Sequence, residues 1–329
     1  RVIDALYEIN GAYALVGIAN DKLIGVRDPL GIRPLVLGKM NESYIFASET
    51  CALDIIGAKF VREVENGEVV VISADGIKSY KPFPKKPERP CIFEYIYFAR
   101  PDSIVGGKSI YECRKGFGRE LANESNVEAD MVIPIPDSGV PSAIGYAEQA
   151  GIPFELGITR NHYVGRTFIQ PKQSIRSFGV RLKHNANRTL VTGKRIVLID
   201  DSIVRGTTSV KIVQMMREAG AKEIHFRVSS PPITHSDFYG IDTPSKDQLL
   251  ASTKSVDEMC EYLGADSLAF LSIEGIYQAL GHKDGRNADC PQYTDHCFTG
   301  DYPTLLEDES GGELNSQLSF LSMAEPHEH

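Results

Sequence analysis

The segment from 195 to 209 constrains the fold more than any other part of this chain. Residues 196–199 form a continuous apolar run, which is typical of a strand buried on both faces of a sheet. From Thr207 onward apolar residues recur at helical spacing, and Gly220 then ends the predicted helix. A buried strand that leads directly into a helix predicts a parallel sheet with helices on its faces.

The turn between this strand and this helix carries two acids, a glycine and three hydroxyl groups: Asp200, Asp201, Ser202, Gly206, Thr207 and Thr208. Free backbone amides at a helix start favour an anion, and a glycine lets the backbone approach a ligand closely. Adjacent carboxylates can accept hydrogen bonds from ribose hydroxyls or face a hydrated Mg²⁺. Each piece alone also fits an ordinary helix start or solvated loop acids. Their coincidence where open α/β sheets bind ligands predicts a sugar-phosphate site.

Two regions of different pattern are separated by a segment rich in proline. Residues 12–80 contain short β-rich runs and one helical candidate at 51–56, whereas residues 81–90 carry four prolines and cannot form a regular element. Beyond residue 90 strands and helices alternate, which predicts a doubly wound parallel sheet. Strands are expected near 130–135, 153–158, 196–199, 223–229 and 267–271, and helices near 109–123, 140–150, 207–219, 245–251, 255–263 and 273–280. After about residue 306 the chain becomes acidic and rich in Gly and Ser, which predicts disorder.

Composition is that of a soluble enzyme. The 329 residues are 42% hydrophobic and 24% charged, enough for a large core divided between two domains. The net charge of −9 argues against general affinity for nucleic acid, which needs clustered Lys and Arg. No apolar run approaches the roughly 20 residues that span a membrane. We therefore expect no nucleic-acid or membrane partner, and a cytoplasmic location.

Several longer motifs carry a resemblance to a known family. The run at 195–209 resembles the phosphoribosylpyrophosphate (PRPP) signature of type I phosphoribosyltransferases. Four further motifs are similar to the glutamine PRPP amidotransferases (amidophosphoribosyltransferases): EYIYFARPDS at 94–103, PIPDSG at 134–139, NHYVGRTFIQ at 161–170 and FYGID at 238–242. Upstream, RDPLGIRPL at 27–35 and ASET at 47–50 resemble the later part of that family's glutaminase domain. The resemblance runs from about residue 1 to about residue 305.

The resemblance implies a domain organisation. Residues 1–80 would be the C-terminal half of an α+β (αββα) N-terminal-nucleophile glutaminase domain, 81–90 a linker, 91–283 a type I phosphoribosyltransferase domain and 284–329 a tail. The family's glutaminase nucleophile is the first Cys of the mature chain, and this sequence begins with Arg1. We therefore expect a truncated sequence without a glutaminase nucleophile, which keeps at most the ammonia-dependent half-reaction. An intact protein is expected to be a homo-oligomer.

Roles at the site follow from the same resemblance. Asp137, Ser138 and Gly139 would form the pyrophosphate loop, although Pro-Asp-Ser-Gly is also a plain turn sequence. The PRPP loop would comprise Asp200, Asp201, Ser202, Arg205, Gly206, Thr207 and Thr208, with Mg²⁺ at Ser138, Asp200 and Asp201. The segment from about 160 to 192 lacks clear periodicity and is strongly basic, which favours a lid over pyrophosphate rather than a solvated loop. Its conspicuous residues are Arg160, where Lys is common in the family, Tyr163 and Arg166.

The implied reaction is displacement of pyrophosphate from C1 of PRPP by glutamine-derived ammonia. Inversion at C1 would give 5-phosphoribosylamine, the first intermediate of purine (IMP) biosynthesis. A nucleobase-using phosphoribosyltransferase would share the PRPP loop but leaves residues 1–80 unexplained. A non-catalytic PRPP-sensing regulator would be expected to carry a basic nucleic-acid-binding module, which this sequence lacks.

The six cysteines are read as ordinary reduced thiols. Some members of the resembled family carry a structural iron–sulfur cluster on four cysteines. Cys91 and Cys297 match two of those positions, whereas Asp237 and Thr294 stand at the other two. Because such a cluster normally needs four thiolates, we expect none here.

Overall fold

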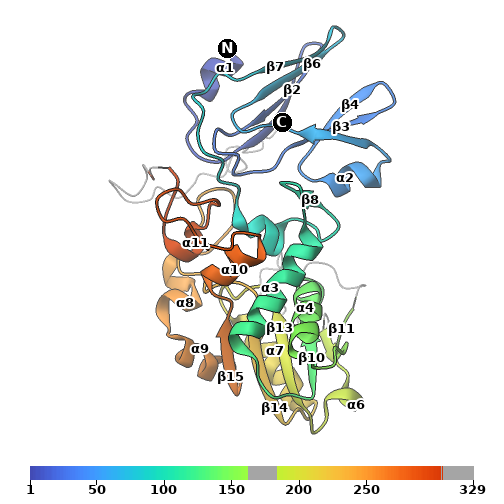
Figure 1. The fold of residues 1–329 in the computed structure, drawn as a ribbon, viewed down its shortest axis with the longest axis vertical. Coiled ribbons are helices and arrows are strands. Elements are labelled where there is room, and N and C mark those ends of the chain that lie inside the picture. Colours follow the sequence, from blue (N-terminus) through green and yellow to red (C-terminus); the bar gives the residue numbers. More distant parts are fainter. Residues whose placement is uncertain (162–183, 305, 307–329) are drawn as a thin grey trace, which may run out of the picture.

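The computed structural model describes residues 1–161, 184–304 and 306. Two units lie one above the other in Figure 1: residues 1–80, coloured blue, form the upper unit, and a parallel sheet with its helices forms the lower one. Residues 81–90 connect them without a regular element, as the proline content predicted. No helix among the described residues is long and apolar enough to cross a membrane.

The upper unit consists of two antiparallel sheets. One has the order β1-β2-β6-β7 and the other β4-β3-β5. Asn20 and Asn41 adopt left-handed backbone in the two-residue turns of the β1–β2 and β3–β4 hairpins, a conformation that Asn tolerates. The bounds are α1 (Val2–Leu6), β1 (Ala14–Ala19), β2 (Lys22–Arg27), β3 (Val36–Met40), β4 (Ser43–Ala47), α2 (Thr50–Ile55), β5 (Lys59–Glu63), β6 (Val69–Ser73) and β7 (Gly76–Tyr80).

The lower unit is built on the predicted parallel sheet, which is confirmed. Its strand order is β10 (Met131–Pro134), β13 (Arg195–Asp200), β14 (Glu223–Val228) and β15 (Ser267–Phe270), all parallel. Val197 and Ile199 pack in one core cluster with residues of α3 (Ile110–Ser125) and α4 (Val140–Ala150). Ile196 and Leu198 pack in a second cluster with residues of α7 (Thr207–Glu218) and α9 (Val256–Leu263). The apolar run is therefore buried on both faces, with α3 and α4 in front of the sheet in Figure 1.

The helices α3 and α4 approach each other at glycine positions. A Cβ atom at Gly118 would collide with the Ser142 carbonyl oxygen, and one at Gly145 with the Lys115 carbonyl oxygen. The two backbones are thus in direct contact, which no larger residue would allow.

Three segments differ from the prediction. The strand expected near 153–158 is one isolated bridge between Val132 and Phe154. Val132 bonds to Pro153 and Glu155 through its amide and its carbonyl oxygen, but Pro134, two residues further along β10, has no amide hydrogen to continue the ladder. The chain then forms β11 (Ile158–Arg160), antiparallel to β12 (His184–Ala186). The helix expected near 245–251 is divided into η3 (Lys246–Gln248) and α8 (Leu250–Thr253), because Leu249 is extended and fully buried.

The remaining elements include one that no periodicity indicated. A π-helix, η1 (Glu94–Phe98), follows the linker. The others are β8 (Ile104–Val105), β9 (Lys108–Ser109), α6 (Arg188–Val191), α10 (Ile273–Ala279) and α11 (His296–Thr299).

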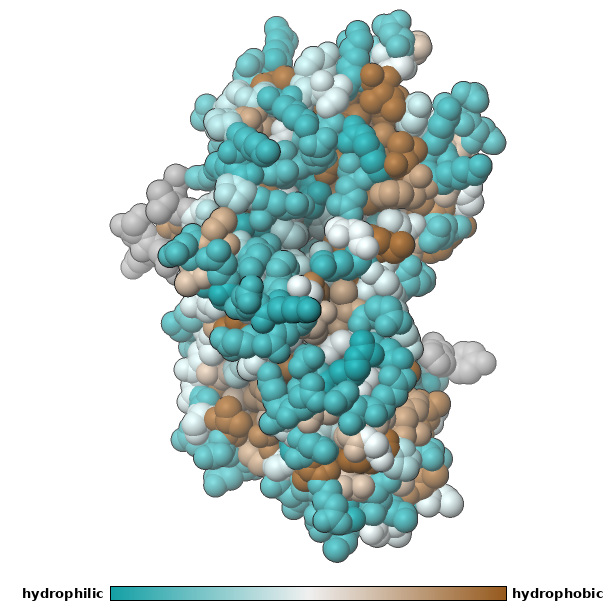
Figure 2. All heavy atoms as spheres, viewed as in Figure 1, coloured by the Kyte–Doolittle hydropathy of each residue, from teal (hydrophilic) through white to brown (hydrophobic). Residues whose placement is uncertain are grey.

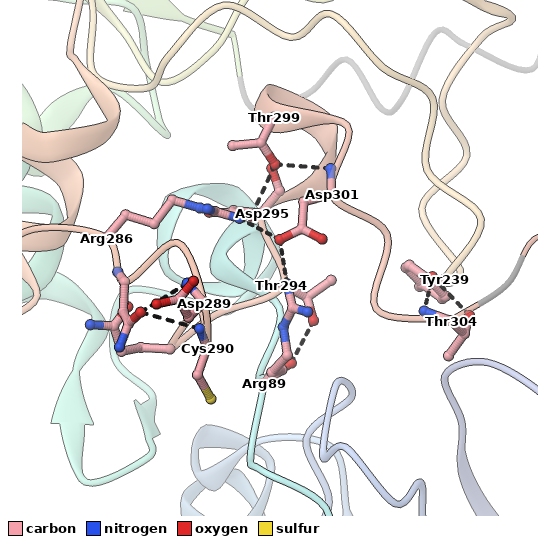
Figure 3. A network of polar contacts seen from close by, with 12 residues as sticks. Arg89, Tyr239, Arg286, Asp289, Cys290, Thr294, Asp295, Thr299, Asp301 and Thr304 are labelled. Carbon is pink, nitrogen blue, oxygen red and sulfur yellow. Dashed lines mark hydrogen bonds and ion pairs between the residues drawn. The ribbon is translucent and has the colours of Figure 1, made fainter.

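Residues 284–304, assigned to the tail by sequence, pack closely on the lower unit. Tyr293, Cys297 and Phe298 belong to the core cluster that contains Ile92 and Phe93. Figure 3 shows the polar contacts of this segment, in which the Arg286 side chain bridges the Asp295 and Asp301 carboxylates.

Candidate functional site

Two loops meet at the carboxyl edge of the parallel sheet. One follows Asp200 at the end of β13 and leads to α7, and the other follows Pro134 at the end of β10 and leads to α4. Pro134 pairs with Ile199, and the amide of Ile135 donates to the Ile199 carbonyl oxygen at 2.8 Å. A Cβ atom at Gly139 would collide with that same oxygen. The structure therefore brings together the two loops that the sequence singled out separately.

The acids of the first loop are both withdrawn from solvent. Asp200 is 8% exposed and Asp201 is 5% exposed. An Asp200 carboxylate oxygen accepts from the Asp201 amide at 3.0 Å, and the Ser202 hydroxyl donates to Asp201 at 2.7 Å. Burial, and then the neighbouring Asp201 carboxylate, raise the pKa of Asp200 well above its usual value. Among the described residues neither acid forms an ion pair with Lys or Arg, so this edge can accept hydroxyl donors or a cation.

The start of α7 offers donors beside these acids. Gly206 precedes the helix with a left-handed φ of 72°, and a Cβ atom there would meet the Leu250 side chain. No side chain caps the first turn, while Thr207 and Thr208 are exposed. The uncapped amides and these two hydroxyl groups form a surface suited to an anion.

The second loop is paired with a residue of the predicted lid. Arg160, at the end of β11, forms an ion pair with the exposed Asp137 carboxylate. Tyr163 and Arg166 lie outside the described residues. Arg205 is exposed and donates to the Gln248 side-chain oxygen at 3.2 Å, so its guanidinium is directed toward η3 rather than toward the two acids.

Arg114 is a residue of this region that the sequence analysis did not single out. It lies on α3, is 3% exposed, and donates to the carbonyl oxygens of Tyr95, within η1, and of Ala99, directly after it. Burial lowers the pKa of Arg114, and the Asp201 carboxylate is the strongest of the charges that oppose this. The sequence could have identified Arg114, because this charged residue lies on the same apolar face of α3 as Phe117 and Leu121.

The segment after η1 also contacts the upper unit. Glu49, at the start of α2, accepts from the Arg100 amide at 2.7 Å and from the Ser103 hydroxyl at 2.8 Å. Arg33 donates to Glu94 and to the Tyr239 carbonyl oxygen, both at 2.8 Å. The motif at 94–103 is thus held by Arg114 below and by the upper unit above.

Comparisons with known proteins agree with this geometry. Residues 109–231, which include both loops, match the phosphoribosyl transferase domain family, and residues 1–54 match the glutamine amidotransferase domain family. An amidophosphoribosyltransferase of Rhizobium etli is 60% identical over 98% of this chain and 66% of its own length. One from Archaeoglobus fulgidus is 47% identical over 94% of this chain and 67% of its own length.

A solved structure shares the fold. The glutamine PRPP amidotransferase of Bacillus subtilis, complexed with ADP and GMP, matches with a TM-score of 0.84 and 50% identity over 92% of this chain and 66% of that one. This chain spans between about half and two thirds of the length of the curated relatives it matches. By sequence and by fold, it belongs to the amidophosphoribosyltransferase family.

Proposed function

We propose that this chain carries the PRPP site of an amidophosphoribosyltransferase, which makes 5-phosphoribosylamine from PRPP and ammonia for purine biosynthesis. The observation that carries this proposal is the meeting of the buried Asp200–Asp201 pair with the uncapped start of α7 and with the loop before α4. Family membership supplies the reaction class, and the site geometry supports a ligand with a phosphate and a ribose.

The 5-phosphate would bind at the start of α7. Backbone amides of the 202–208 loop and the hydroxyl groups of Ser202, Thr207 and Thr208 would donate to its oxygens. Asp200 and Asp201 would accept from the 2- and 3-hydroxyls of the ribose. Their charge would also favour the positive charge that develops on the ring as pyrophosphate leaves.

Pyrophosphate would lie against the 137–139 loop. Among the described residues no three His, Cys, Asp or Glu side chains converge on one metal position. Mg²⁺ is usually held by one or two carboxylates together with substrate phosphates, so the oxygens of Ser138, Asp200 and Asp201 fit it. A bound Mg²⁺ would neutralise charge on the departing pyrophosphate. Arg160 would exchange its ion pair with Asp137 for the pyrophosphate, together with Tyr163 and Arg166.

The step itself needs positioning more than proton transfer. Ammonia attacks C1 with its lone pair, the C1–O bond to pyrophosphate breaks, and the resulting ammonium group releases a proton to solvent. No strong base is therefore required. In the whole protein we propose that glutamine supplies the ammonia, that the enzyme is a cytoplasmic homo-oligomer, and that nucleic acids and membranes are not partners.

PRPP consumption by the full chain tests this function. Ammonium should support turnover, whereas adenine, guanine and hypoxanthine should not. Turnover with a base but not with ammonium would assign a nucleobase-using phosphoribosyltransferase instead. PRPP binding without turnover on any acceptor would favour a PRPP-sensing regulator.

A further inference from the structure

Three segments that are distant in sequence meet behind the linker. The amide of Ile92 donates to the Thr294 carbonyl oxygen at 3.1 Å, and the Thr294 amide donates to the Pro90 carbonyl oxygen at 2.9 Å. From the other side, the Thr234 amide donates to the Cys297 carbonyl oxygen at 2.9 Å. In Figure 3 Arg89 and Thr294 lie together, where the linker and the C-terminal segment meet. We call this contact of residues 89–92, 233–241 and 293–302 the junction.

The junction contains the four positions at which some family members hold an iron–sulfur cluster. Two of them are the buried residues Cys91 and Cys297. The other two supply oxygen in place of sulfur, and both are engaged. Asp237 accepts from the amides of Tyr239, at 2.9 Å, and Ile241, at 2.6 Å. The Thr294 hydroxyl donates to the Arg89 carbonyl oxygen at 2.6 Å. The residues present therefore do not fit a cluster on four thiolates.

A buried contact between a carboxylate and an imidazole lies at this place instead. Nε2 of His296 is 2.7 Å from Oδ1 of Asp237, and these two residues are 1% and 8% exposed. The Tyr239 ring meets the imidazole edge-on with centroids 5.0 Å apart, and the Tyr302 ring lies 4.9 Å away. Aromatic walls exclude water, so each member of the pair depends on the other to compensate for its burial.

The pair connects two of the three segments that form the junction. Asp237 belongs to the 233–241 loop, where its other carboxylate oxygen fixes the backbone at Tyr239 and Ile241. His296 begins α11 and is adjacent to Cys297, whose carbonyl oxygen accepts from the Thr234 and His235 amides. Loss of the pair would therefore loosen the C-terminal segment from the loop on which it packs.

We propose that the Asp237–His296 contact performs in this chain the structural task of a four-thiolate cluster, so that the junction holds without iron. This inference concerns residues outside the transferase site and does not depend on the proposed reaction.

Thermal melting of the full chain tests the pair. Asp237→Asn and His296→Gln should each lower the melting temperature by roughly 5–10 °C, because each leaves one buried polar partner uncompensated. The double variant should melt no lower than the worse single variant, since both remove one interaction. His225→Gln, at a buried histidine of β14 outside the junction, is the matched control. Additive losses, or losses no larger than the control's, would overturn the role of the pair.

Iron binding tests the four positions, and it does not depend on how stable the single variants are. After anaerobic incubation with ferrous iron and sulfide, the unmodified chain should retain neither, and a chelator should leave its melting temperature unchanged. Retention of iron and sulfide would overturn the proposal. Asp237→Cys combined with Thr294→Cys should gain iron, sulfide and visible absorption, and adding Cys91→Ser should abolish that gain. A double cysteine variant that binds no iron would show that these are not ligand positions.

Discussion

The two units of this molecule each contain an apolar strand, but β13 of the lower unit is buried and β1 of the upper unit is exposed. In the lower unit, β13 is buried from Ile196 to Asp200 and its side chains fill a core cluster on each face. In the upper unit, every residue of β1 is exposed, and Ile18 is 82% exposed. Most of the strongly exposed large apolar side chains among the described residues lie in the upper unit: Val2, Tyr7, Ile9, Leu15, Val16, Ile18, Met40, Ile55, Ile56, Phe60, Val61 and Tyr80. Figure 2 shows apolar surface gathered along one side of that unit.

The two units also differ in the size of their hydrophobic cores. The upper unit has three small core clusters, whereas each cluster of the lower unit spans a whole face of the sheet. Leu30 and Ile32 of the small unit are buried in one core cluster of the large unit, and polar contacts such as Arg33–Glu94 and Glu49–Ser103 join the two units as well. We infer that the stability and the PRPP site both reside in the lower unit, and that the upper unit depends on these contacts.

The largest expected difference between the two units is in how a substitution affects PRPP turnover. Asp200→Asn should reduce ammonia-dependent PRPP turnover by about 100-fold or more, because it removes from a water-poor site the carboxylate that we propose binds the ribose hydroxyls. Its melting temperature should stay near that of the unmodified chain. Asp54→Asn, an exposed acid on α2, serves as the matched control and should leave turnover unchanged. Near-normal kinetics for Asp200→Asn would remove that residue from the site.

The next comparison concerns the apolar strands. Leu198→Ala, in the centre of the lower sheet, should reduce the free energy of unfolding by about 3 kcal/mol, because it opens a cavity in a fully buried position. Ile18→Ala, on the exposed β1, should change that free energy by less than about 0.5 kcal/mol. Denaturant unfolding followed by circular dichroism measures both. A comparable loss for Ile18→Ala would mean that β1 is covered in solution, and the contrast between the units would then be wrong.

Dependence of the upper unit on the lower can be tested at Arg33. Arg33→Met removes the guanidinium that donates to Glu94 and to the Tyr239 carbonyl oxygen, at an expected cost of about 2 kcal/mol. Residues 1–80 should then unfold before the parallel sheet, giving two transitions in place of one. Lys39→Met removes an exposed ion pair with Glu42 and should cost less than about 1 kcal/mol. A single transition for Arg33→Met would show that other contacts hold the units together.

How far the sequence predicts the structure also differs between regions. Helices and strands from 109 to 280 were predictable where periodicity was strong, as at α3, α4, α7 and β13. Prediction failed where burial or a proline overrode the local pattern. Leu249 interrupts a helical pattern because its side chain is buried, and Pro134 on the neighbouring strand limits a β-rich run to one bridge. The π-helix at 94–98 has no periodic signature of its own and is held by Arg114, which is distant in sequence.

The candidate site, too, was predictable from the sequence in some parts and not in others. The two loops were predictable because each lies between a buried strand and a helix, and parallel strands bring such loops to one edge. The direction of Arg205 toward Gln248 was not predictable, because it depends on where the 246–248 turn packs. The contact of Asp237 with His296 was not predictable either, since these residues are 59 positions apart and meet only through tertiary packing.

The smallest expected effect is a pH dependence confined to the upper unit. Burial alone would raise the pKa of Glu68, but hydrogen bonds from Arg62, Ser79 and the Glu65 amide outweigh it and hold the pKa below its usual value. Folding therefore favours the ionised form. Its stabilisation is fully present above the unfolded pKa of about 4.3 and is lost as the pH falls through the lower folded value.

Glu68→Gln should accordingly weaken the upper unit at neutral pH and flatten its loss of stability below about pH 4.3. Hydrogen exchange of β6 amides, measured against β13 amides, would separate the two units in one sample. Glu42→Gln, at an almost fully exposed acid of the same unit, is the matched control. If the β6 amides lose protection with acid as steeply in Glu68→Gln as in the unmodified chain, other carboxylates cause the pH dependence. A response as large in β13 would show that acid acts on the molecule as a whole and is not confined to the upper unit.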